Sequence, residues 1–190
     1  GWTEPIRLAA ELPTTEGCFP RVAADPTGTV HVVWNSWVGP RPRGEFSLWA
    51  SNTIYYRSWD GNAWSDPVDI LVPLETADMI QANSISATSD GLVVVTWASG
   101  MDIGISQAPI GEANRVQSWK HMLLGAGTDA KFATDQELGR WYVTYTSNDR
   151  AHILFTYSED QGQTWASPET VWSVPSDSSA ATNWGVCVAS

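Results

Sequence analysis

The sequence predicts an all-β fold built from repeated four-stranded antiparallel sheets, and three observations predict it. Tryptophans recur at positions 2, 64, 119 and 165, about one for each sheet. Short runs rich in Val, Thr, Tyr and Trp alternate with turns rich in Gly, Asp and Pro. No segment has a long apolar period of 3.6 residues; residues 108–118 come nearest, and Pro109 and Gly111 weaken that pattern.

The first elements are a single strand and a complete sheet. Residues 1–9 match the outer, closing strand of a preceding sheet. Residues 19–73 then form a full sheet, because a hairpin that turns between Asp25 and Gly28 is followed by a second one that turns at Asp60-Gly61. The two hairpins together supply four strands in chain order.

The same unit then recurs along the chain. Residues 80–125 predict a second sheet, with a tight turn at Asp90-Gly91 and a longer, less regular second turn. Residues 129–175 predict a third sheet, and residues 180–190 begin the inner strand of a further one. The whole chain is therefore interpreted as one partial β-propeller domain, with about three full blades around a common axis.

A specific turn motif supports this interpretation. The third blade contains the pattern S-x-D-x-G-x-T-W, formed by Ser158, Asp160, Gly162, Thr164 and Trp165. An Asp in a tight turn accepts hydrogen bonds from the following N–H groups, Gly allows a positive φ, and Trp packs within the blade. A version one residue shorter lies in the first blade, at Ser58, Asp60, Gly61 and Trp64.

These turns resemble the Asp-box, or BNR, repeats of β-propellers in the sialidase (neuraminidase) superfamily. The resemblance implies six blades in the complete propeller, so that this chain would be a partial one. It also implies that the boxes are structural and lie on the face opposite the active site. A three-blade arc has open strand edges, and we expect another chain, a second copy or sequence absent here to complete it.

The candidate site is expected where inner strands begin and where second strands join third strands. Residues 36–52 form the longest loop on this face, and long loops on a rigid scaffold often have functional roles. The candidates for substrate binding come from it: Trp37, Arg41, Arg43, Glu45 and Trp49. Trp offers a face for sugar stacking and Arg offers planar donors for a carboxylate. The alternative is that the aromatic rings pack the loop down and the arginines are solvated.

Three residues are candidates for catalysis. Arg21 follows Pro20 at the start of an inner strand, and resembles, with Pro and Arg transposed, the R-I-P motif whose arginine binds the substrate carboxylate in sialidases. Asp78 and Asp129 lie at suitable loop ends. No complete set with the Tyr–Glu pair of sialidases can be assembled. The alternatives are a structural Arg21 and solvated aspartates, and whether the chain is an enzyme stays open.

The resemblance implies an extracellular propeller that binds carbohydrate and is part of a glycoside hydrolase acting on acidic sugars. The alternative is a non-catalytic propeller that serves as a protein-interaction or structural subunit of a larger assembly. The incomplete catalytic set favours this alternative slightly. The expected partner is therefore a glycan or a protein, and the expected location is extracellular, cell-surface or periplasmic.

Charge argues against one class of partner. The chain has 21 acidic residues and 10 Lys and Arg residues, a formal net charge of −11, without a basic cluster. Such a surface repels phosphate backbones, so no nucleic acid is expected. The longest apolar run, residues 92–97, is too short to span a membrane.

Cofactors are not expected either. His31, His121 and His152 are isolated and show no metal-ligand spacing, although a structural calcium at a loop stays an open alternative. Cys18 and Cys187 allow one disulfide, and two separate buried thiols are the alternative.

Overall fold

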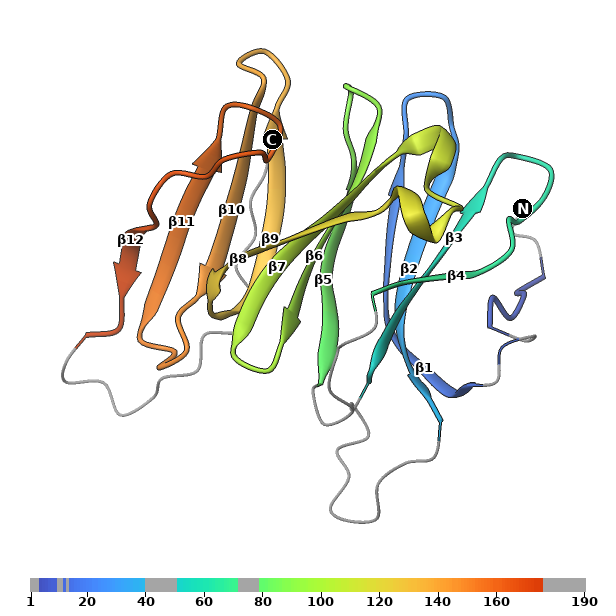
Figure 1. Cartoon of the computed structure of the whole chain (residues 1–190), viewed down its shortest axis with the longest axis horizontal. Helices are drawn as coiled ribbons and strands as arrows, with labels where there is room; N and C mark the ends of the chain where they lie inside the picture. Colours follow the sequence, from blue (N-terminus) through green and yellow to red (C-terminus); the bar gives the residue numbers. More distant parts are fainter. Residues whose placement is uncertain (1–3, 10–11, 13, 40–50, 72–78, 176–190) are drawn as a thin grey trace.

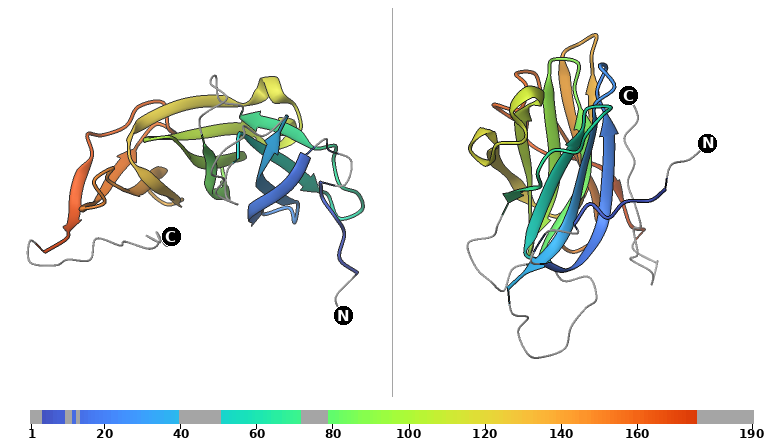
Figure 2. Two further views of the ribbon diagram at one scale, coloured as in Figure 1. Left: turned by 90° about the horizontal axis from the view of Figure 1, so that it is seen from below. Right: turned by 90° about the vertical axis from the view of Figure 1, so that its right-hand side faces the viewer.

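A computed structural model describes residues 4–9, 12, 14–39, 51–71 and 79–175. Within these residues, twelve strands form three four-stranded antiparallel sheets, and there is no α-helix. Figure 1 shows the three sheets side by side, and the left view of Figure 2 shows them fanned into an open arc. Each sheet is one blade of a β-propeller.

The strands of each blade are hydrogen-bonded in chain order, from an inner first strand to an outer fourth strand. Blade 1 consists of β1 (Thr14–Ala24), β2 (Val30–Val38), β3 (Thr53–Trp59) and β4 (Val68–Leu71). Blade 2 consists of β5 (Ile80–Ala87), β6 (Leu92–Ser99), β7 (Asp102–Pro109) and β8 (Lys120–Ala126). Blade 3 consists of β9 (Thr128–Asp135), β10 (Arg140–Thr146), β11 (His152–Ser158) and β12 (Glu169–Ser173).

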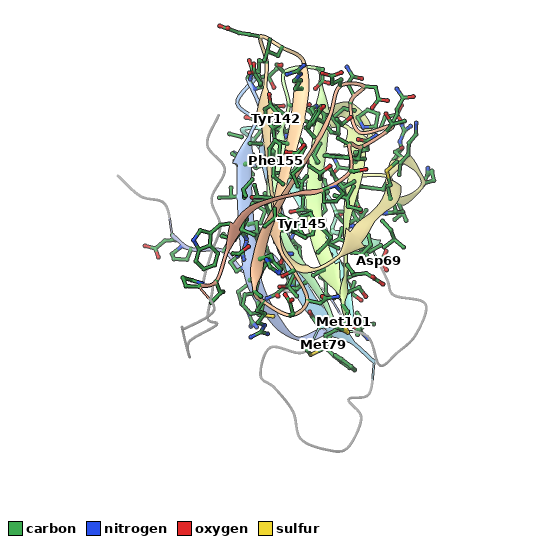
Figure 3. The ribbon with its side chains drawn as sticks, turned by 90° about the vertical axis from the view of Figure 1, so that its left-hand side faces the viewer. Asp69, Met79, Met101, Tyr142, Tyr145 and Phe155 are labelled. Carbon is green, nitrogen blue, oxygen red and sulfur yellow. The ribbon has the colours of Figure 1, made fainter. Side chains whose placement is uncertain are left out.

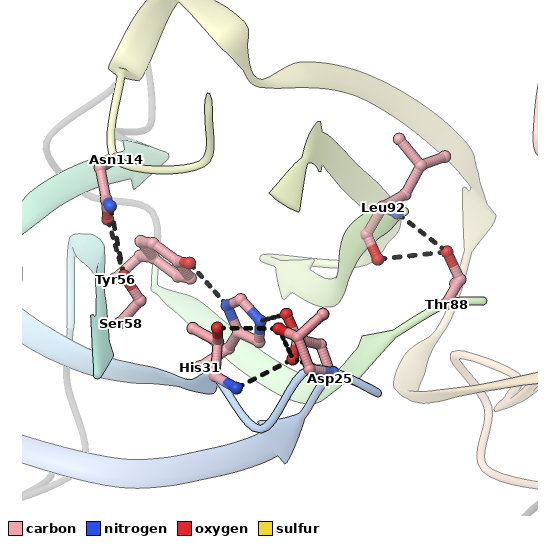
Figure 4. Close-up of polar contacts among 9 residues, drawn as sticks. Asp25, His31, Tyr56, Ser58, Thr88, Leu92 and Asn114 are labelled. Carbon is pink, nitrogen blue, oxygen red and sulfur yellow. Dashed lines mark hydrogen bonds and ion pairs between the residues drawn. The ribbon is translucent and has the colours of Figure 1, made fainter. Parts of the chain in front are cut away.

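A polar side chain at the end of each inner strand stabilises the first hairpin turn. Asp25 Oδ1 accepts hydrogen bonds of 2.9 Å from the N–H groups two and four residues later. Thr88 Oγ1 accepts one from Leu92 N at 3.1 Å (Figure 4), and Asp135 Oδ1 accepts two of 3.0 Å. Gly28 supplies the positive φ of 90° in the first of these turns, a conformation that other residues rarely adopt.

The segment between β7 and β8 contains no α-helix, in line with the all-β prediction. It forms two short 3₁₀ helices, η1 (Ile110–Glu112) and η2 (Val116–Ser118), where residues 108–118 were the best candidate for a helix. The segment packs Ala113 and Trp119 against blade 1, and the Trp119 indole donates to the Ala113 carbonyl at 2.8 Å. No helix in the described part of the chain is long and apolar enough to cross a membrane.

The hydrophobic core lies between the blades. The cluster between blades 1 and 2 includes Tyr56, Val95 and Trp97, and the cluster between blades 2 and 3 includes Ile105 and Trp141. Fully burying one such side chain contributes about 1.5–3 kcal/mol. These two clusters therefore fix each blade against its neighbour.

Close packing in blade 2 depends on one glycine. A Cβ atom at Gly104 would lie 2.2 Å from the Trp97 ring, so only glycine allows the indole to pack across β7. The same indole donates a hydrogen bond of 2.8 Å to Ser106 Oγ. Trp97 is thus fixed by both packing and a polar contact.

The face of blade 1 that points away from blade 2 is covered by the N-terminal segment. Val32, Trp34 and Tyr55 pack there against Leu8 and Leu12. Residues 4–9 form no strand in the structure, and residues 1–3 lie outside the described part. The outer strand expected at residues 1–9 therefore stays a prediction, as does the inner strand expected at residues 180–190, which also lies outside the described part.

Candidate functional site

Turns of two kinds lie at opposite ends of the blades. The first hairpin turns and the turns between β3 and β4 and between β11 and β12 lie at the upper end in Figure 1. The starts of the inner strands and the turns that join β6 to β7 and β10 to β11 lie at the lower end. The described candidates Arg21, Trp37 and Asp129 lie in β1, β2 and β9, and β1 and β9 start and β2 ends at this lower end, so the candidate site is built from there.

A β-bulge interrupts every inner strand near this end. In each blade two inner-strand residues lie opposite one residue of the second strand: Phe19 and Pro20, Ala82 and Asn83, Asp129 and Ala130. Phe19 and Asp129 have φ angles of 51° and 56°, in the left-handed region. Bulges redirect the side chains that follow them and are frequent beside functional sites. The residues next in sequence are Arg21, Ser84 and Lys131.

Two of these residues meet at one backbone carbonyl. Arg21 Nε donates to the Asn83 carbonyl oxygen at 3.0 Å, and Lys131 Nζ donates to the same oxygen at 2.9 Å. Arg21 Nη1 also donates to the Pro20 carbonyl at 3.0 Å, which fixes the guanidinium. One cation from blade 1 and one from blade 3 therefore converge on the inner strand of blade 2.

Polar side chains hold the bulges in register across the blades. Asn35 Oδ1 of blade 1 accepts from the Ala82 N–H of blade 2 at 2.9 Å. Thr96 Oγ1 of blade 2 donates to the Ala130 carbonyl of blade 3 at 2.7 Å. Because the Thr96 hydroxyl has one proton, the Ser84 hydroxyl, 2.6 Å away, donates to Thr96. Hydrogen bonds between neighbouring blades thus fix the positions of the bulges relative to one another.

Two cationic side chains meet at this site. Arg21 and Lys131 lie close together in a chain with a net charge of −11, and like charges repel each other at this range. Guanidinium pairs with carboxylates through two parallel hydrogen bonds. The Asn83 side chain is buried, and its Nδ2 has no hydrogen-bond partner among the described residues, which leaves a further donor at the same bulge.

One sequence-predicted acid lies at the bulges. Among the six described bulge residues, Asp129 is the single carboxylate. Glycoside hydrolysis ordinarily requires two carboxylates that flank the scissile bond. The six described bulge residues therefore do not by themselves supply the pair of groups that would cleave a glycosidic bond.

The predicted loop residues fall into two groups. Trp37 lies in β2 and is 6% exposed, so its ring presents no open face for stacking. The other candidates lie outside the described residues: Arg41, Arg43, Glu45, Trp49 and Asp78. Two methionines, Met79 and Met101, are exposed at this end of the blades (Figure 3). They provide an apolar surface that the sequence did not indicate.

The motif turn of blade 3 forms a closed hydrogen-bond network. The Thr164 hydroxyl and N–H donate to the Asp160 carboxylate at 2.6 and 2.8 Å, and the Ser158 hydroxyl donates to it at 2.7 Å. Gly162 N donates to Ser158 Oγ at 2.8 Å, and the Trp165 indole donates to the Gly162 carbonyl at 3.2 Å. The bonds from Thr164 and Ser158 lower the pKa of Asp160 to about 2, which keeps the carboxylate charged.

The shorter turn of blade 1 is held differently. The N–H groups of Asn62 and Ala63 donate to Asp60 Oδ1 at 2.8 Å, and these bonds lower the pKa of Asp60. Ser58 Oγ is 3.2 Å from the side chain of Asn114, which belongs to blade 2. Gly61 supplies a φ of 98°, and the Trp64 ring packs against Trp59 with centroids 5.6 Å apart. Both motif turns lie at the end of the blades opposite the bulges (Figure 1).

The histidines make separate contacts. His31 is fully buried; its Nδ1 lies 2.7 Å from the Tyr56 hydroxyl and its Nε2 lies 3.6 Å from Asp25 (Figure 4). Burial lowers the pKa of His31 and raises the pKa of Tyr56 to about 12. His121 contacts Ser106 at 2.8 Å and His152 contacts Ser173 at 2.9 Å. In the part of the chain that the structure describes, no group of His, Cys, Asp or Glu is arranged to hold a metal.

A cleft of about 580 Å³ lies between blades 2 and 3 at the motif-turn end. It is lined mainly by polar and aliphatic side chains of β7, β8 and the turn: Leu92, Ile105, Gln107, Lys120, His121, Met122, Gln161, Gly162 and Gln163. None of the bulge residues lines it. This cleft and the cation pair are therefore at opposite ends of the blades.

Comparisons with known proteins agree on the fold. No protein-family model and no curated protein matches the chain. The solved structures that resemble it include Hadza microbial sialidase Hz136 (TM-score 0.56, 18% identity, 77% of this chain and 32% of that one). They also include a Penicillium chrysogenum α-L-arabinanase complexed with arabinobiose (TM-score 0.56, 12% identity, 90% of this chain and 53% of that one). A third is a Dyadobacter fermentans protein of unknown function (TM-score 0.59, 13% identity, 90% of this chain and 55% of that one).

These similarities concern the fold and part of each structure. Identities of 12–18% are consistent with a shared propeller architecture of four-stranded blades. The chain spans between a third and just over half of the length of these solved chains.

Proposed function

We propose that this chain forms part of a carbohydrate-binding β-propeller of the sialidase-like, Asp-box type, and that its bulge end binds the acid group of an anionic sugar. The observation that supports this proposal is the convergence of Arg21 and Lys131 on the Asn83 carbonyl. The names of two structurally similar proteins, a sialidase and an arabinanase, give independent support for a sugar ligand.

The chemistry of the pair favours an acidic sugar over a neutral one. Arg21 offers a planar guanidinium held in place by two carbonyl groups, and Lys131 adds a second positive charge. A carboxylate gains charge-assisted hydrogen bonds from both groups, whereas a neutral sugar gains ordinary hydrogen bonds only. The charge of the ligand would therefore determine most of the selectivity.

Our more specific proposal is that the complete propeller hydrolyses acidic sugars in addition to binding them. Asp129 would act as the acid or base in that reaction, since it lies in the same bulge that precedes Lys131. A second carboxylate would have to come from residues beyond the described part, and Asp78 is the candidate from the sequence. We also propose that the protein works outside the cytoplasm, where complex glycans are exposed.

A non-catalytic propeller that serves as an interaction or structural subunit is the second candidate. It is favoured by the single carboxylate at the described bulges and by the exposed Met79 and Met101 at the same end. Exposed apolar side chains at that end suit a protein surface better than a sugar. Binding of anionic sugars is the property that separates the two candidates.

Calorimetric titration at low salt tests the binding. We expect the protein to bind N-acetylneuraminic acid or glucuronic acid and to bind galactose far more weakly. Arg21→Ala and Lys131→Met should each weaken binding of the acidic sugar by roughly 10- to 100-fold, the value of one charged hydrogen bond. The exposed Arg115, on the connection between β7 and β8, provides the matched control Arg115→Ala, which should change nothing. Equal affinity for acidic and neutral sugars would refute the proposal.

Hydrolysis is tested separately with a fluorogenic sialoside. Turnover that Asp129→Asn abolishes, with binding retained, supports the enzymatic form. Binding without turnover supports the non-catalytic form.

A further inference from the structure

The face of blade 3 that points away from blade 2 is equivalent to the faces on which blades 1 and 2 hold their next neighbours. Strand register identifies the equivalent residue pairs, one pair in each blade. The pairs are Val33 with Tyr56, Thr96 with Ile105, and Thr144 with Phe155. The first four residues are at most 3% exposed, because the next blade covers them. The face in blade 3 has the same position and has a similar composition.

This face of blade 3 is aromatic and partly exposed. Tyr142 stacks on Phe155 with ring centroids 5.8 Å apart, and Phe155 stacks on Tyr157 at 6.3 Å. All three rings are half-buried, whereas Tyr56 at the equivalent position in blade 1 is fully buried. Figure 3 views the molecule from this side, with Tyr142 and Phe155 in front. The face therefore has the residues of an inter-blade core without a described blade against it.

A polar group on the same face also lacks its counterpart. Thr96 Oγ1 donates to the backbone carbonyl of Ala130 in the next blade. Thr144 occupies the equivalent position in blade 3, is 9% exposed, and its Oγ1 has no hydrogen-bond partner among the described residues. A buried hydroxyl without a partner is destabilising, so the position favours a carbonyl acceptor from another strand.

We propose that residues 182–188 form an inner strand that packs on this face and accepts the Thr144 hydroxyl with a backbone carbonyl. In both inter-blade contacts of the structure, the covering inner strand follows directly in sequence: β5 after β4, and β9 after β8. Residues 182–188 follow β12 in the same way. Their sequence, TNWGVCV, is uncharged and rich in strand-forming residues, which suits an aromatic face. The segment lies outside the described residues.

A second copy of the chain is a less suitable occupant. The surface that a second copy would present head to tail is the outer face of blade 1, and Leu8, Ala9 and Leu12 already pack against that face. Docking of a copy would have to displace them. The segment of the same chain needs no such displacement.

The reactivity of Cys187 tests the proposal, because this cysteine lies within the proposed strand. In a Cys18→Ser background of the full 190-residue chain, Cys187 is the only thiol. We expect N-ethylmaleimide to modify it at least about tenfold more slowly in buffer than in denaturing urea, because the strand must open first. Phe155→Asp, which places a charge in the aromatic face, should restore fast labelling.

Two further variants keep the test decisive. Thr144→Val removes only the hydroxyl and should speed labelling about fivefold, the effect of one lost hydrogen bond. Leu123→Asp places the same charge on β8 at a side chain that is 65% exposed, and should leave the rate unchanged. Circular dichroism verifies that each variant is folded.

The remaining outcomes would overturn the proposal. Labelling as fast in buffer as in urea would show that the segment does not dock. Slow labelling that neither Phe155→Asp nor Thr144→Val accelerates would show that Cys187 is protected by contacts other than this face of blade 3. A dimeric native mass together with fast labelling would identify a second copy as the occupant.

Discussion

The motif turns of blades 1 and 3 are held by different contacts. In blade 3, Ser158, Asp160 and Thr164 satisfy one another inside a single turn. In blade 1, the turn is one residue shorter, and its serine, Ser58, instead contacts Asn114 of the neighbouring blade. The complete motif is therefore self-contained, whereas in the short version Asp60 is satisfied within the turn and the serine contacts the neighbouring blade. Four predictions test this difference, from the largest expected effect to the smallest.

Substitution of the turn glycines should give the largest difference in stability loss between the two turns. A Cβ atom at Gly162 would lie 2.8 Å from the Trp141 ring, at a φ of 79°, whereas nothing lies within 4 Å of one at Gly61. We expect Gly162→Ala to reduce the free energy of unfolding by about 3 kcal/mol, from overpacking and backbone strain together. Gly61→Ala should cost about 1 kcal/mol, from backbone strain alone. Urea denaturation measures both, and equal losses would contradict the interpretation.

Removal of the serine hydroxyl should again destabilise the protein more in the blade 3 turn than in the blade 1 turn. Ser158 Oγ accepts the buried Gly162 N–H, so Ser158→Ala leaves that donor unsatisfied and should cost about 2 kcal/mol. Ser58→Ala removes one long contact with Asn114 and should cost less than about 1 kcal/mol. Chemical denaturation of the matched pair is the measurement. A larger loss in the free energy of unfolding for Ser58→Ala than for Ser158→Ala would contradict the interpretation that the blade 3 turn is the self-contained one.

Acid should weaken the complete turn in a defined pH window. The pKa of Asp160 is about 2 in the folded protein, against 3.8 for an unperturbed aspartate such as that of the unfolded chain. The charged Asp160 therefore contributes fully to stability above about pH 4. As pH falls from about 4 to about 2, the unfolded state binds the proton first, and the contribution is lost. We expect the stability of the wild type to fall more steeply in this window than that of Asp160→Asn. Parallel pH profiles for the two proteins would contradict the lowered pKa.

The contact between blades should give the smallest effect. Asn114→Ala should cost about 0.5–1 kcal/mol, the value of an ordinary hydrogen bond. In double-mutant cycles it should couple to Ser58→Ala and be additive with Ser158→Ala, because Ser158 shares no partner with it. Coupling of Asn114 to Ser158 would show that the complete turn also depends on its neighbour.

Local patterns were sufficient to predict the blades. Turn residues such as Asp25 and Gly28 act within a few positions of the chain, so their effect is visible in the sequence. Residues 108–118 came nearest to a helical pattern, and Pro109 and Gly111 weakened it. The segment forms two short 3₁₀ turns, with Ala113 and Trp119 packed against blade 1.

The candidate site was predicted only in part. Arg21 was identified from its resemblance to a motif, but Asn83 and Lys131 were not, because their meeting depends on the register between blades. One signal was present: Lys131 occupies the same position in its repeat as Arg21 does. The bulges have no such signal, because Phe19 and Asp129 adopt left-handed backbone conformations that favour glycine.

The outermost strand of blade 3 has a consequence for handling the protein in solution. Strand β12 pairs with β11 along one side, and every residue from Glu169 to Ser173 is exposed, including Val171 and Trp172 at 58% and 42%. Among the described residues no strand pairs with its other edge, and such an edge next to apolar side chains invites sheet extension by another molecule. At high concentration the protein should therefore self-associate rim to rim, and a lysine introduced at Val171 should improve its solubility.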